Sequence, residues 1–279
     1  MLTPDHGVTR FSDLLRAGVT KTQVDQLVDT GRLVRVRRGW YAVPAADAAV
    51  VRAVRLGGTL SCVSALQYYG VWVPPDPRLH IRMSEHHQAR AVLPGGVHIC
   101  PLPIRSAPGV AVDSLSTALL AAVRCLDDEG LVVVMDSILN QRLMGRGDLV
   151  RLLTDAPHRV QRLLREVDPN AQSGTESMVR FRLRRLGVKV QTQVFIEGVG
   201  RVDMLVGERL VIEADSRQHH TGVENYANDR RRGIVLLGGE TYAARLTYEQ
   251  VVFGWDEVQS QILRFVRRRA HRAPRRRAA

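Results

Sequence analysis

The chain has 279 residues, 45% of them hydrophobic, which is enough for two or more domains with sizeable cores. Its net charge of +12 favours a polyanionic partner. With neither an apolar run of membrane-spanning length nor a secretory pattern, we expect a soluble, cytoplasmic, nucleoid-associated protein. The three cysteines, Cys62, Cys100 and Cys125, lack C-x-x-C spacing, which indicates neither a disulfide framework nor a zinc site, so small core residues are expected.

Residues 8–43 have the pattern of a winged helix-turn-helix. A short helix is expected at 9–17, and the capping box Thr-Lys-Thr-Gln at 20–23 begins a second helix. The alternating segment at 33–43 contains an Arg-Gly turn and predicts a β-hairpin wing. The side chains that we expect to contact DNA phosphates lie on the second helix and the wing: Lys21, Arg32, Arg35, Arg37 and Arg38.

This portion resembles the N-terminal domain of AbiEi-type antitoxins. The resemblance implies a DNA-binding domain and makes a toxin or another regulatory protein an expected partner. The second helix also carries Asp25 and Asp29, so the wing offers the stronger phosphate contacts. A winged helix that binds another protein is the alternative, because a fold does not determine a function.

Residues 46–170 are expected to form a mixed α/β domain, and they resemble the continuation of AbiEi-type proteins. Apolar patterning predicts helices around two short strands, at 79–83 and 97–100, with proline-rich loops between them. The histidines here have no recognisable ligand spacing, and we expect loop or core positions for His80, His86, His87 and His98. A linker at 168–174 leads into the next domain.

Two alternating segments around a Gly-Glu turn predict a β-hairpin that carries acids. Asp203 lies on the first strand, and Glu213 and Asp215 point the same way from the second. Pairing about the turn places Asp203 within about one residue of Glu213, so three carboxylates are expected to converge. Their repulsion favours a divalent cation, and hard oxygen ligands on a rigid sheet suit Mg²⁺ or Mn²⁺. An edge strand that carries acids against aggregation is the alternative.

Segments on both sides of this hairpin add candidates. Upstream, Glu176 is the third helical residue of a Ser-x-x-Glu capping box. Downstream, a His-His pair at 219–220 precedes an expected helix that carries an Asp-Arg-Arg-Arg run at 229–232. A strand at 241–246 and a final helix capped at 247–250 complete an α/β core. The alternatives are that the histidines are loop residues and that the arginines form a solvated helix face.

The helix, strand, strand, helix order of residues 172–266 resembles the PD-(D/E)xK nuclease superfamily, and more narrowly its branch related to the very-short-patch-repair endonuclease. The motif pieces are VDM at 202–204, VIEAD at 211–215, HH at 219–220 and NDRRR at 228–232. The resemblance implies a restriction-endonuclease-like α/β core and metal-dependent hydrolysis of DNA phosphodiester bonds. Asp215 replaces the superfamily's lysine, so a histidine, or Lys189 before the hairpin, has to assist a metal-bound hydroxide, and we favour histidine.

The same resemblance assigns roles to individual residues, with Asp203 as the central ligand. The expected metal ligands are Asp203, Glu213, Asp215, the Ala214 carbonyl and, through water, Glu176. The expected catalytic residues are these acids together with His219 and His220, which assist proton transfer. The expected DNA contacts near this site are Asp229, Arg230, Arg231 and Arg232.

The last thirteen residues, 267–279, contain seven arginines and no acid, so more than half of the net charge lies there. A proline and the lack of an apolar stripe predict a disordered tail that contacts phosphates without reading sequence. Its first expected contacts are Arg267, Arg268 and Arg269. A tail that serves only solubility is the alternative.

Together these features predict a multidomain α/β protein with domains at 1–45, 46–170, 171–266 and a tail at 267–279. The favoured function is an Mg²⁺- or Mn²⁺-dependent DNA endonuclease in repair or defence, which acts as a homodimer if it breaks both strands. The alternative is a DNA-binding repressor or antitoxin whose nuclease-like domain is inactive. An aromatic content of only 5% disfavours single-stranded RNA as the substrate.

Overall fold

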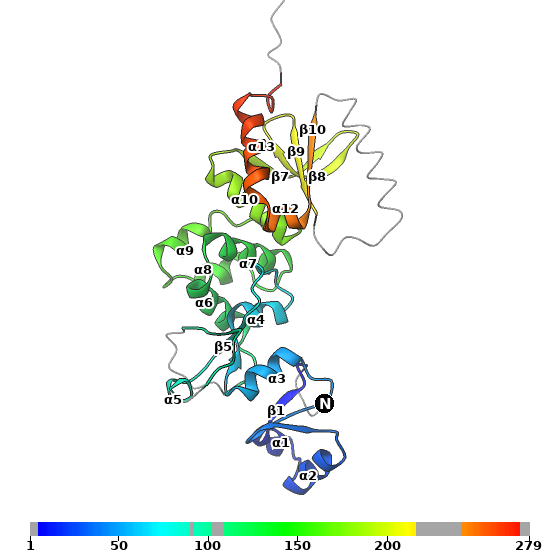
Figure 1. Ribbon diagram of the computed structural model, residues 1–279, viewed down its shortest axis with the longest axis vertical. Helices are drawn as coiled ribbons and strands as arrows, with labels where there is room; N and C mark the ends of the chain where they lie inside the picture. The colour runs from blue at the N-terminus through cyan, green and yellow to red at the C-terminus, as the bar shows by residue number, and fades with distance from the viewer. Residues whose placement is uncertain (1–4, 90–91, 102–108, 216–240, 274–279) are drawn as a thin grey trace, which may run out of the picture. The chain divides into compact units, whose positions relative to one another are not determined.

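The computed structural model describes residues 5–89, 92–101, 109–215 and 241–273 of the chain (Figure 1). The chain divides into two compact units, Met1–Leu126 and Asp127–Ala279. This division differs from the expected boundaries at residues 45 and 170, because the winged helix shares a unit with the α/β region that follows it. No helix among the described residues is long and apolar enough to cross a membrane.

The first unit begins with the expected helix-turn-helix and wing. Its elements are β1 (Val8–Arg10), α1 (Phe11–Arg16), α2 (Lys21–Asp29), β2 (Val34–Arg37) and β3 (Trp40–Ala42). The capping box of α2 forms as predicted: the Gln23 backbone N–H donates to Thr20 Oγ1 (3.3 Å), and the Thr20 N–H donates to Gln23 Oε1 (2.8 Å). The short strand β1 was not predicted, and it pairs with β3 to give the strand order β1-β3-β2.

The rest of the first unit is a small α/β layer. Its elements are α3 (Ala48–Arg55), β4 (Thr59–Leu60), α4 (Cys62–Tyr68), β5 (Leu79–Arg82), α5 (Glu85–Gln88), β6 (Val97–Ile99) and α6 (Leu115–Cys125). Strand β5 is central, antiparallel to β4 and parallel to β6. The two longer strands match their prediction, whereas β4 has only two residues and is too short to show a pattern. Arg82, at the end of β5, forms a buried ion pair with Asp113, with Nη2 and Oδ1 2.5 Å apart.

The second unit opens with helices that we had placed in the middle domain. They are α7 (Asp128–Asn140), α8 (Arg146–Leu152) and α9 (His158–Leu163), and α7 packs against α10 (Gly174–Arg185). Three ion pairs join α7 to α10: Arg182 with Glu129, Arg185 with Asp128, and a buried pair between Arg180 and Asp136. These contacts explain why residues 127–170 belong with the C-terminal sheet rather than with the region before them.

A four-stranded sheet forms the other half of this unit. Its elements are β7 (Val190–Ile196), β8 (Gly200–Val206), β9 (Leu210–Ala214), β10 (Tyr242–Leu246), α12 (Tyr248–Val252) and α13 (Trp255–Arg267). The order is β10-β9-β8-β7, in which β7, β8 and β9 are antiparallel neighbours and β10 runs parallel to β9. Figure 1 shows α10, α12 and α13 gathered along one side of this sheet. The predicted hairpin, the strand at 241–246 and the final capped helical region are therefore confirmed.

The beginning of the basic tail differs from its prediction. Arg267 is the last residue of α13, and the chain then turns back onto the β8–β9 turn. The Glu208 backbone N–H donates to the His271 carbonyl (2.8 Å), and a Cβ on Gly207 would meet that carbonyl oxygen at 2.4 Å. The chain near His271 is therefore held against this turn rather than forming a free arm, while Arg267, Arg268 and Arg269 are exposed. Residues 274–279 lie outside the described ranges.

Candidate functional site: a carboxylate pair and a basic wing

Glu176 lies in the first turn of α10 and is almost fully buried, with 7% of its surface exposed. Ser173 caps the helix as predicted, and its hydroxyl also donates to Glu176 Oε1 (3.1 Å). The other carboxylate oxygen, Oε2, accepts from the Gln172 backbone N–H (3.0 Å) and from Gln193 Nε2 on β7 (2.9 Å). Burial, and then the negative charge of Asp203, raise the pKa of Glu176 to about 7.

Asp203, on β8, is therefore close enough to Glu176 for the two charges to repel. Its Oδ2 accepts a hydrogen bond from the Ala214 backbone N–H on β9 (3.0 Å). The β8–β9 ladder ends with Met204 paired to Ile212, and Asp203 and Glu213 are the next residues on the two strands. Continuing that register by one residue gives the predicted arrangement, in which the two acids share a face of the sheet.

Glu213 has a partner that the sequence did not indicate. Its Oε2 lies 3.0 Å from Nε of Arg245, the residue paired with it on the parallel strand β10. Asp215, just beyond β9, is exposed, and its backbone N–H donates to the Leu246 carbonyl (2.8 Å). Within the described ranges the oxygens of the four candidate acids do not form a compact group of three, so the expected convergence is reduced to Glu176 and Asp203.

Several predicted site residues lie outside the described ranges. They are His219, His220, Asp229, Arg230, Arg231 and Arg232. Lys189, the alternative to a catalytic histidine, is described, but it lies just before β7 in a hollow that is also lined by Gly207 and His271. The β7–β8 register pairs the adjacent Val190 with Val206, at the hairpin turn and away from Asp203. Lys189 therefore does not replace the missing lysine at the carboxylate pair.

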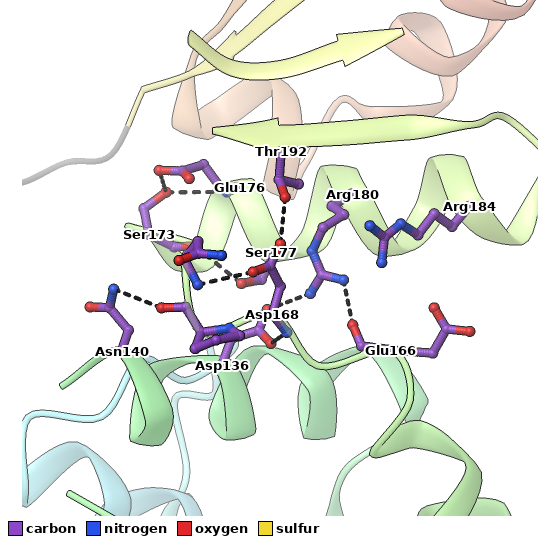
Figure 2. A network of polar contacts seen from close by, with 12 residues as sticks. Asp136, Asn140, Glu166, Asp168, Ser173, Glu176, Ser177, Arg180, Arg184 and Thr192 are labelled. Atoms are coloured by element: carbon purple, nitrogen blue, oxygen red, sulfur yellow. Dashed lines mark hydrogen bonds and ion pairs between the residues drawn. The ribbon is translucent and has the colours of Figure 1, made fainter. Parts of the chain in front are cut away.

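A buried polar network joins α10 to α7 and to β7, the first strand of the four-stranded sheet (Figure 2). Arg180 Nη2 lies 2.5 Å from Asp136 Oδ2, and Arg180 Nη1 donates to the Glu166 carbonyl. Asp136 Oδ1 accepts from the Asp168 backbone N–H (2.7 Å), and Asp168 Oδ2 accepts from the Thr192 hydroxyl on β7 (2.6 Å). Since Thr192 precedes the glutamine that donates to Glu176, this network also positions one side of the carboxylate pair.

The winged helix presents most of its predicted basic side chains to solvent. Lys21, Arg32, Arg35 and Arg38 are exposed, on α2, before the wing and along it. Arg37 differs: its guanidinium carbon lies 5.6 Å from the centre of the Trp40 ring, and burial lowers its pKa. We therefore assign Arg37 to packing of the wing, and the other four remain candidates for phosphate contact.

Residues 8–42 thus define a helix-turn-helix followed by a two-stranded wing, which is the architecture of winged-helix DNA-binding domains. Residues 5–44 match a family model described as "Transcriptional regulator, AbiEi antitoxin". A search of curated proteins finds no match to the chain. The family match supports the resemblance stated for the N-terminal region, and it ends before α3.

Sequence patterns missed three groups of residues with evident roles. Gln193 and Arg245, which contact the predicted acids, lie on different strands from those acids, and nothing local marks them. The one available signal for Asp136 was an acid within the apolar run LVVVMDSIL. The third group lies in the first unit and is described below.

Proposed function

We propose that the protein is a DNA-binding transcriptional regulator of the antitoxin type, which binds duplex DNA through its winged helix. The observation that carries this proposal is the match of residues 5–44 to the AbiEi antitoxin model, over a domain whose wing and second helix expose four cations. A toxin or another regulatory protein is the partner that an antitoxin requires, and the second unit is the part of the chain available to bind it.

The charge distribution of the domain indicates how it would hold DNA. On α2, Lys21 is accompanied by the exposed acids Asp25 and Asp29, so this helix attracts phosphate only at its first turn. Arg35 and Arg38 are exposed on the wing, which has no acid between them. We therefore expect the wing arginines to supply phosphate contacts and the polar side chains of α2 to contact base edges.

The paired substitution Arg35→Ala/Arg38→Ala should weaken binding to a mixed-sequence duplex by roughly tenfold or more at low salt. Two lost phosphate contacts should also reduce the slope of log K against log salt by about 2. Fluorescence anisotropy across a salt series measures both effects. The matched control is Arg162→Ala/Arg165→Ala, which removes the same charge from exposed positions of the second unit.

An unchanged slope in the wing variant, or an equal loss in the control, would contradict the assignment of DNA binding to the wing. The regulatory role needs a second measurement, which is selection of bound sequences from a random duplex pool. Enrichment of one site supports a regulator. Uniform recovery of all sequences argues for nonspecific DNA binding.

A metal-dependent nuclease is a second candidate function, and the Glu176–Asp203 pair favours it. Burial, and then the charge of a neighbouring carboxylate, raise the pKa of Glu176, and a bound cation would offset both effects; hard oxygen donors suit Mg²⁺ or Mn²⁺. The predicted set of metal ligands fits a divalent ion only in part, because one of its members, Glu213, is paired with Arg245. Asp203 would hold the ion directly, with Glu176 through water and the Ala214 carbonyl as further donors. When bound, the ion would activate water and offset charge on the phosphate.

Asp203→Ala should abolish any Mg²⁺- or Mn²⁺-dependent cleavage of plasmid or linear duplex and leave duplex affinity within about twofold, because the winged helix lies in the other unit. The cleavage assay includes EDTA, and anisotropy on the same preparations measures binding. Asp155→Ala, at an exposed acid elsewhere in this unit, is the control for loss of charge. Cleavage that persists in Asp203→Ala would remove the site assignment, whereas salt-sensitive binding without any cleavage would leave the regulator as the function.

A further inference from the structure

All three cysteines of the chain meet in the first unit, beside a histidine. The Sγ atoms of Cys62, Cys100 and Cys125 and a ring nitrogen of His80 all lie within 4.8 Å of one another. Within the group, Cys100 Sγ lies 3.6 Å from His80 Nδ1. Cys62, Cys100 and His80 occupy core positions, as expected. Their convergence was not predicted, because residues far apart in sequence are brought together only by the fold.

Each of the four residues comes from a different element. Cys62 is the first residue of α4, His80 lies in the central strand β5, Cys100 directly follows β6, and Cys125 ends α6. Backbone hydrogen bonds hold the first three in place: the Ser61 N–H donates to the His80 carbonyl (3.0 Å), and the Cys100 N–H donates to the Ile81 carbonyl (2.9 Å). No pair of ligands shares a short turn, so the sequence has none of the spacings by which such sites are recognised.

Asp76 holds the histidine ring from its far side. Its Oδ2 lies 3.0 Å from His80 Nε2, and Arg78 in turn holds Asp76 through Nε (2.9 Å) and Nη2 (2.7 Å). A carboxylate at Nε2 favours the proton on that nitrogen, which leaves the lone pair of Nδ1 directed at the cysteines. This is the arrangement in which histidines bind metals, with the second ring nitrogen donating to a carboxylate.

Burial makes the cluster a poor fit to other chemistry. Cys62 and His80 are 0% exposed, Cys100 is 3% exposed, and Cys125 is only partly exposed, so the cluster is closed on the side of its first three residues and is not a substrate site. A disulfide would use only two of the three sulfurs and would leave the oriented histidine unexplained. Cys62 also has a φ of +49°, a conformation that costs a non-glycine residue about 1–3 kcal/mol and persists where surrounding structure requires it.

We propose that Cys62, His80, Cys100 and Cys125 bind one structural Zn²⁺ ion. Three thiolates and one imidazole nitrogen make a tetrahedral site with no open position, which is typical of structural rather than catalytic zinc. The ion connects α4 and α6 to the sheet formed by β4, β5 and β6, so zinc binding contributes to folding of this unit. His98, whose Nε2 lies 3.5 Å from Cys125 Sγ, is placed to donate to a thiolate of the site. This inference is independent of the proposed function.

The first test uses the unmodified chain, purified without chelator from cells grown with added zinc. We expect about one zinc ion per chain by elemental analysis, and no thiol that reacts with a disulfide reagent under native conditions. Chelation should release the zinc, lower the melting temperature and make three thiols reactive, and added Zn²⁺ should reverse these changes. Cobalt substitution should give the intense visible bands of a tetrahedral thiolate site. A zinc-free, folded chain whose melting temperature does not respond to Zn²⁺, or one with a Cys–Cys disulfide, would overturn the proposal.

The second test compares two histidines that are neighbours in space: His80, the proposed zinc ligand, and His98, which is not a ligand. The rings of His80 and His98 are in contact, with centroids 4.6 Å apart and planes tilted by 41°, so both variants disturb the same neighbourhood. His80→Ala should lose the zinc, His98→Ala should retain it, and Asp76→Asn should retain it with affinity reduced by about 10- to 100-fold. Zinc retained in His80→Ala and lost in His98→Ala would overturn the ligand assignment. The cobalt spectra are measured on the folded fraction of each variant. A variant that is merely less stable therefore does not give the spectrum of one that has lost a metal ligand.

Discussion

Arg180→Met should lower the free energy of unfolding of the second unit by about 3–5 kcal/mol. Arg180 and Asp136 are 1% and 0% exposed, and removal of the cation leaves the carboxylate buried without its charged partner. Burial already raises the pKa of Asp136, which is the direction expected for an acid that depends on its partner for ionisation. Urea unfolding monitored by circular dichroism measures the change.

Two further variants distinguish the effect of breaking this ion pair on stability from the effect of simply removing a charge. Arg185→Met removes an exposed cation from the same helix, 2.9 Å from Asp128, and should change stability by less than about 1 kcal/mol. The double variant Arg180→Met/Asp136→Leu removes the unpaired charge and should recover part of the loss. Recovery is incomplete because the Asp168 N–H then loses its acceptor on Asp136. A loss below about 1 kcal/mol in Arg180→Met would show that the pair does not hold α10 on α7.

The elements that sequence predicted correctly are those determined by neighbouring residues. The capping box at Thr20 and Gln23 forms because both partners lie within one helical turn. The hairpin follows from alternation and a short turn, and the structure pairs its strands from Val206 with Leu210 to Met204 with Ile212. Local signals therefore located the wing, the hairpin and the helix that carries Glu176.

The features that sequence missed depend on contacts between distant segments. Arg180 meets Asp136, Arg245 meets Glu213 and Cys125 meets Cys62 only after helices and strands have packed. A single sequence contains no period or spacing that links such residues, so their types are visible and their partners are not. The two compact units divide at Leu126 rather than at the expected boundaries for the same reason, since long-range ion pairs join α7 to α10.

Glu176→Gln should change how stability depends on pH. The folded-state pKa of Glu176, about 7, lies above its ordinary value of 4.5. When folding raises the pKa of an acid, its protonated form stabilises the folded protein. This contribution to the free energy of unfolding is fully present below about pH 4.5 and is lost as pH rises through about 7. At roughly 1.4 kcal/mol per pKa unit, the wild type should lose up to about 3 kcal/mol across this window. The neutral glutamine should remove that loss, so the variant should be the more stable protein at pH 8.

Asp203→Asn is the matched control, because the charge of Asp203 is the second cause of the shift and burial is the first. It should reduce the pH dependence without abolishing it. Unfolding free energies from urea titrations between pH 4.5 and 8 distinguish the three proteins, and coincident profiles for wild type and Glu176→Gln would remove the electrostatic account of the pair. Repeating the series with Mn²⁺ connects the result to function. An ion held by Asp203 and Glu176 should stabilise only the wild type at pH 8, whereas equal stability with and without Mn²⁺ would separate the carboxylate pair from metal chemistry and favour a purely regulatory protein.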